Sequence, residues 1–134
     1  MRRLPLWLLL VGSGVVVIGV LLQAFSIVAW VRGAGPGALD MHKDVADAVH
    51  VGELAVVVGA VWARWGNWRA VGLAALFLVV SVLQVVLIGD TDKQGGWVNG
   101  LHGFLALVVL IAAVAYAERA SRRLGLRARI APQG

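Results

Sequence analysis

The sequence predicts an all-α integral membrane protein, an up-down-up-down four-helix bundle built from two similar helical hairpins. The first observation is composition: of 134 residues, 60% are hydrophobic and only 14% are charged, against about 25% charged in a typical soluble domain. The second is four apolar runs, each near the roughly 20 residues that cross a bilayer. The third is a repeat, because each half of the chain has a Leu-Gln pair (Leu22-Gln23 and Leu83-Gln84) followed by a histidine (His50 and His102).

The transmembrane domain is expected to cover residues 1–120, followed by a basic cytoplasmic tail over 121–134, with helices at about 4–31, 41–65, 70–88 and 97–120. The first run is too long for the roughly 7–15 residue h-region of a secretory signal, so it is expected to remain as a helix. Its glycines are expected to mark close contacts with another helix; they are Gly12, Gly14 and Gly19. The segment Gly33-Ala-Gly-Pro36-Gly37 predicts a turn, after which Asp40 is expected to cap the second helix.

The basic residues predict the orientation of the chain in the membrane, because cytoplasmic loops are enriched in Lys and Arg. Nine of them fall at the ends of the chain and in the loop between the second and third helices: Arg2, Arg3, Arg64, Arg69, Arg119, Arg122, Arg123, Arg127 and Arg129. Three fall in the other two loops: Arg32, Lys43 and Lys93. We therefore expect a multi-pass protein of a bacterial plasma membrane with both termini in the cytoplasm. The net charge of +5 then faces lipid head groups, and no nucleic-acid partner is expected.

Five polar residues fall inside the predicted spans, where ionisable groups cost several kcal/mol unless they are paired or hydrated. They are Gln23, His50, Glu53, Gln84 and His102, all in the outer half of the bilayer. Each histidine lies about five residues below the outer edge of its helix, roughly 7–8 Å deep at 1.5 Å per residue. Two histidines at equal depth on different helices predict a shared site.

The predicted site is one haem b held between the second and fourth helices near the outer face. In an up-down bundle these helices are diagonal neighbours, so His50 and His102 are placed to bind both axial positions of one iron. Gly52 and Gly103 would let the macrocycle approach the backbone. The glutamines Gln23 and Gln84 are expected to orient the imidazole N–H groups. Because the chain has no cysteine, covalent haem attachment, thiolate sites and iron–sulfur clusters are excluded.

The phrases Val49-His50-Val-Gly and Leu101-His102-Gly, one per hairpin, resemble the helix starts of a small bacterial four-helix membrane family. The paired hairpins also resemble bis-histidine b-type cytochromes and the four-helix halves of haem A synthase. This resemblance covers about residues 4–120 and implies the haem-ligand role for the two histidines. Haem A synthase halves have a glutamate before and an arginine after a histidine, whereas valines flank His50, so the synthase reaction is not implied.

The predicted function is electron transfer with quinol or another membrane redox partner, but the sequence leaves alternatives open. The histidines are also compatible with a structural pair in an accessory subunit of a larger membrane complex. A third alternative is a small metal-binding or transport protein that uses His50, Glu53, His102 and His42, although His42 also fits a solvated loop. Glu53 shares the helix face of His50 and is a candidate proton or polar relay. No nucleophile constellation or phosphate loop indicates a hydrolytic enzyme, and the oligomeric state is left open.

Overall fold

The computed structural model describes residues 3–64, 67–88 and 96–126, and all its regular structure is helical. The four helices are α1 (Arg3–Val31), α2 (Pro36–Ala63), α3 (Trp68–Ile88) and α4 (Gly96–Leu124). Each of them is long and apolar enough to cross a membrane. The prediction of an all-α protein with four membrane-length helices is therefore confirmed.

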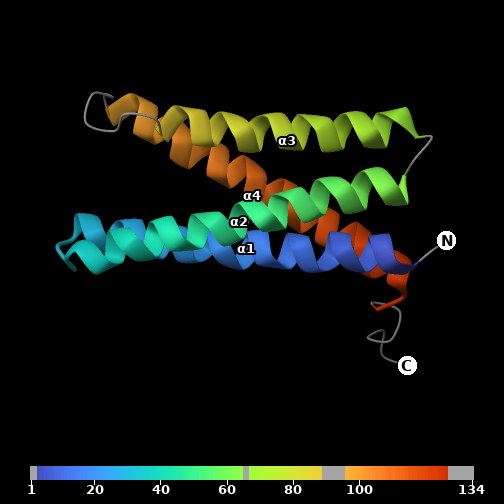
Figure 1. Ribbon diagram of the computed structural model, residues 1–134, viewed down its shortest axis with the longest axis horizontal. Coiled ribbons are helices and arrows are strands. Elements are labelled where there is room, and N and C mark those ends of the chain that lie inside the picture. Colours follow the sequence, from blue (N-terminus) through green and yellow to red (C-terminus); the bar gives the residue numbers. More distant parts are fainter. Residues whose placement is uncertain (1–2, 65–66, 89–95, 127–134) are drawn as a thin grey trace, which may run out of the picture.

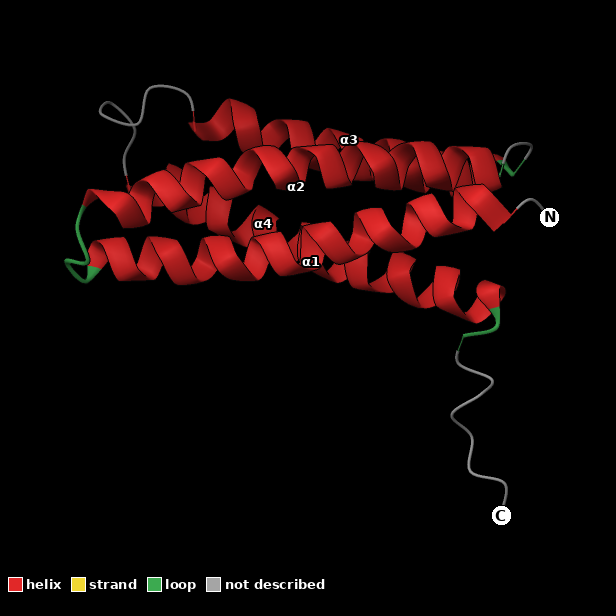
Figure 2. Ribbon diagram, turned by 60° about the horizontal axis from the view of Figure 1, so that its bottom comes forward, coloured by secondary structure: helices red, strands yellow, loops and turns green. Residues whose placement is uncertain are grey.

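The helices form a bundle in which α1 packs against α2 and α4, and α3 packs against the same two helices (Figure 1). This arrangement places α2 and α4 across a diagonal. α1 and α2 run side by side over their whole length, whereas α4 crosses them at an angle (Figures 1 and 2). The turn between α1 and α2 lies at the same end of the molecule as the start of α4, and the N-terminus lies at the opposite end with the last turn of α4 (Figure 1).

Glycines permit the close contact between α1 and α2. A Cβ atom on Gly12 would lie 2.8 Å from Cβ of Ala55 and 2.9 Å from the carbonyl oxygen of Gly52. A Cβ on Gly19 would likewise collide with the side chain of Val49. The expected packing role is thus confirmed for Gly12 and Gly19, but not for Gly14, which has nothing within 4 Å of its Cβ position.

The second helix begins five residues earlier than predicted. Gly33 and Gly35 take positive φ angles of 91° and 89°, and the helix starts at the next residue, Pro36. Proline suits the first helical position because its missing N–H would have no partner there. Gly35 is the N-cap and no side chain caps the helix, so the prediction that Asp40 is the cap is wrong.

The last helix is also longer than predicted, continuing through four residues of the expected tail to Leu124. Gly125, with a φ angle of 74°, ends it, and the N–H of Leu126 donates to the carbonyl of Ser121. Several residues used in the topology argument lie outside the described part of the chain: Arg2, Lys93, Arg127 and Arg129.

The core is narrow, and large apolar side chains cover the outside of the bundle. Val16, Val56 and Val109 are almost completely buried, one from each of α1, α2 and α4. Bulky side chains such as Ile18 and Ile111 are mostly exposed in the isolated chain. An apolar outer surface of this kind is what hydrocarbon solvation requires and is typical of a multi-pass membrane protein.

Candidate functional site: the histidine cluster

His42 and His102 lie toward the end of the bundle that contains the α1–α2 turn, whereas His50 lies at the middle of α2. His42 and His50 are on α2 and His102 is near the start of α4. A positive charge on either α2 histidine would act on His102, which places all three within electrostatic range of one another. His50 and His102 therefore lie in the same region of the bundle.

His50 makes a hydrogen bond with Glu53, one turn further along α2. Its Nδ1 atom lies 2.9 Å from Oε2 of Glu53, whose side chain is only 5% exposed, whereas that of His50 is 41% exposed. With Glu53 as the acceptor of this hydrogen bond, the proton is on Nδ1 and the Nε2 lone pair is free. A carboxylate on one ring nitrogen and a free second nitrogen is the usual arrangement of a metal-ligating histidine.

The residue that contacts Nδ1 of His50 is thus Glu53, and not one of the glutamines predicted for that task. Gln23 takes part through its backbone: its carbonyl oxygen lies 3.0 Å from Nδ1 of His42 and also accepts a hydrogen bond from Ser26. His42 is therefore a helical residue that links α2 to α1, and not a solvated loop residue. The helical spacing of His50 and Glu53 was the one sequence signal for their contact.

His102 differs from the other two histidines because its Nδ1 atom is buried without a hydrogen-bond partner in the described part of the chain. Gln84 is buried on the adjacent α3, and its backbone interacts with the imidazole of His102. A buried polar atom left unsatisfied costs about 1–3 kcal/mol. Such an atom fits a ligand that is not part of the polypeptide.

The two glycines assigned to the haem site have different surroundings. Gly103, next to His102, has nothing within 4 Å of its Cβ position, so its flank is open. Gly52 is buried against α1, where a Cβ atom would lie 3.0 Å from the carbonyl oxygen of Gly12. Gly52 therefore serves helix packing in this structure, and its flank is not open to a macrocycle.

The donor set suits a cofactor that needs few protein ligands. Across residues 3–64, 67–88 and 96–126, no three His, Cys, Asp or Glu side chains are grouped so as to hold a metal ion. A divalent-metal site made from His50, Glu53, His102 and His42 is accordingly not assembled. Haem requires only axial ligands from the protein, because the macrocycle supplies the remaining four nitrogens. The imidazoles of His50 and His102 meet that requirement in number, and His50 also has the hydrogen bond that orients a ligating imidazole.

The function of this chain is inferred from its site and not from similarity to known proteins. No protein-family model, characterised protein or solved structure matches this chain.

Proposed function

We propose that this protein is a b-type cytochrome-like membrane protein that holds one haem between His50 and His102. The main support for the proposal is the hydrogen bonding of the two imidazoles. The Nδ1 atom of His50 is hydrogen-bonded to a buried carboxyl group, and His102 has a buried Nδ1 with no partner within the described residues. A structural pair of histidines would be expected to satisfy its ring nitrogens within the bundle.

The proposed topology is up-down-up-down with both termini in the cytoplasm of a bacterial cell. It is supported by the excess of Lys and Arg at the ends of the chain and in the second loop. It is also supported by the common position of the N-terminus and the end of α4 (Figure 1). With this orientation, the histidine cluster lies near the outer face of the plasma membrane.

His50 and His102 would hold the haem, which when bound would supply a one-electron redox centre. The protein's own residues would orient it: Glu53 holds the tautomer and ring orientation of His50, and the open flank of Gly103 leaves space beside His102. Glu53 therefore acts as a positioning residue in this proposal. The electron donor would be quinol or another membrane-bound redox partner.

The proposal is tested by purifying the protein in detergent from cells supplied with haem precursors and measuring its haem content. We expect one non-covalent b-type haem per chain, with the sharp reduced α and Soret bands of a six-coordinate iron. A colourless protein from such cells would overturn the proposal. The histidines would then be structural residues, as expected for an accessory subunit of a larger membrane complex.

A further inference from the structure

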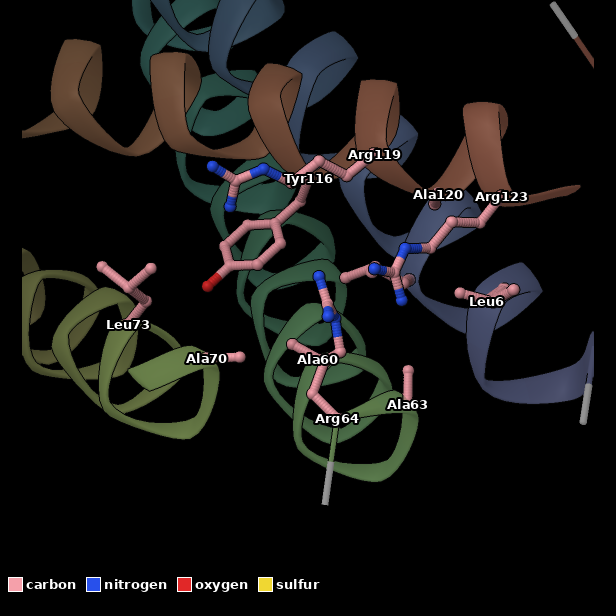
Figure 3. A pocket seen from close by; sticks show the side chains of 11 residues that line it. Leu6, Ala60, Ala63, Arg64, Ala70, Leu73, Tyr116, Arg119, Ala120 and Arg123 are labelled. Atoms are coloured by element: carbon pink, nitrogen blue, oxygen red, sulfur yellow. The ribbon is translucent and has the colours of Figure 1, made fainter. Parts of the chain in front are cut away.

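A second polar site lies at the other end of the bundle, where the last turns of α2 and α4 meet (Figure 3). Residues from all four helices line a pocket of about 40 Å³. Its charged residues are Arg64, just beyond the end of α2, and Arg119 and Arg123, one turn apart on α4. In Figure 3 the guanidinium groups of Arg64 and Arg123 point into the same space from opposite sides, with the Tyr116 ring beside them.

These three arginines concentrate positive charge that the described part of the chain does not neutralise. None of them forms an ion pair there, whereas the neighbouring Arg122 pairs with Glu118 at 2.6 Å. Burial, together with the positive charges of Arg123 and Arg119, lowers the pKa of Arg64. Guanidinium groups nevertheless remain protonated in proteins. The like charges therefore repel one another, and an anion bound among them would relieve that repulsion.

An apolar groove continues from this pocket along the bundle. A cavity of about 260 Å³ between α3 and α4 shares Leu73, Tyr116 and Arg119 with the arginine pocket, and its remaining lining is entirely apolar. Phe77 and Tyr116 join the two helices there by an edge-to-face contact, with ring centroids 5.8 Å apart. The groove follows α3 from Leu73 to Val80, which is the direction from the end of the bundle towards its middle.

We propose that the arginine pocket and the α3–α4 groove together bind one anionic phospholipid. Its phosphate would lie among Arg64, Arg119 and Arg123, and one acyl chain would occupy the groove. Arginine suits this role because its planar group of donors matches phosphate oxygens. The site lies where the membrane helices end, which is the depth of lipid head groups and of interfacial tyrosines.

The pocket as it stands has about the volume of one water molecule. A phosphate therefore requires the arginine side chains to turn outward, which the solvent exposure of Arg119 and Arg123 permits. This inference needs the membrane-spanning arrangement but does not depend on haem. The arginine pocket contains none of the histidines and lies at the end of the bundle away from His42 and His102, so either proposal can fail while the other holds.

Native mass spectrometry of the detergent-purified protein with added phosphatidylglycerol or phosphatidylcholine tests the proposal. The pocket variant is Arg64→Gln/Arg123→Gln. The control Arg69→Gln/Arg122→Gln removes the same charge from residues that line neither the pocket nor the groove. We expect the wild type and the control to prefer phosphatidylglycerol. The pocket variant should bind it at least about tenfold more weakly, because two charge-assisted hydrogen bonds are lost.

A third variant, Ala112→Phe, fills the groove without changing charge and should also weaken phosphatidylglycerol binding. Thermal melting of each variant separates loss of binding from loss of folding. Equal binding by the pocket variant and the wild type, or equal loss in the control, would overturn the proposal. Displacement of the lipid by millimolar inorganic phosphate, with Ala112→Phe having no effect, would contradict the assignment to a lipid and indicate a free phosphate site.

Discussion

The Nδ1 atom of His50 lies 2.9 Å from Oε2 of Glu53, and the two residues are three positions apart on α2. The carboxylate is buried, and this imidazole is its hydrogen-bond partner in the described chain. With Glu53 as the acceptor, the contact orients the imidazole and leaves its Nε2 atom available to a metal. It is the feature that most clearly distinguishes His50 from a histidine that only packs between helices.

Replacing Glu53 with alanine should weaken haem binding by about 10–100-fold, the usual effect of removing a residue that orients a metal-ligating histidine. Glu53→Gln keeps an acceptor for the Nδ1 proton and should retain haem better than alanine does. The measurement is haem loss from the purified variants to an excess of apomyoglobin. If Glu53→Ala kept its haem as tightly as the wild type, the carboxylate would have no part in the site.

His102→Leu should raise the melting temperature of the haem-free protein. A buried nitrogen without a partner costs about 1–3 kcal/mol of stability, and the substitution removes it. The matched control is His42→Leu, which removes a hydrogen bond to the Gln23 carbonyl and should lower the melting temperature. Both are measured by thermal unfolding in the same detergent. A lower melting temperature for His102→Leu would identify His102 as a structural residue.

Gly12→Ala should destabilise the protein by about 1–3 kcal/mol, since its methyl group would overlap Ala55 and the backbone of Gly52. Gly14→Ala, two residues away on the same helix, meets no atom within 4 Å and should be neutral or slightly stabilising. Denaturant-induced unfolding in detergent compares the two variants. Equal effects at both positions would show that α1 and α2 do not make this close contact.

The proposed orientation can be tested with single cysteines, because the natural chain has none. Ala34→Cys, in the turn between α1 and α2, should react with a membrane-impermeant maleimide in intact cells. Leu126→Cys, just beyond α4, should react only after the cells are permeabilised. The reverse pattern would place both termini outside and move the histidine cluster to the cytoplasmic face.

The four helices could be predicted from the sequence because the bilayer imposes both a length and an apolar composition on each span. The ends of the helices were predicted less accurately than their number. Asp40 resembles an N-cap, but two glycines with positive φ and a proline start the helix earlier. Helix ends depend on such local backbone geometry, for which composition is a weak guide.

The candidate site was predictable in its residues but not in its contacts. The shared helix face of His50 and Glu53 follows from their spacing, whereas Gln23 contributes a backbone carbonyl, which every residue has. Gly52 illustrates the same limit, because only the packing of α1 decides which of its flanks is open. The arginine pocket was missed because it depends on the angle at which α4 crosses the bundle; the spacing of Arg119 and Arg123 was its one signal in the sequence.

The proposed function requires that His50 and His102 together bind one haem. The reduced-minus-oxidised difference spectrum of the purified wild type, His50→Ala, His102→Ala and the control His42→Ala tests it most directly. We predict α and Soret bands of equal intensity in the wild type and His42→Ala, and their loss in both of the other variants. A featureless wild-type spectrum, or bands that persist in either His50→Ala or His102→Ala with six-coordinate character, would contradict the account.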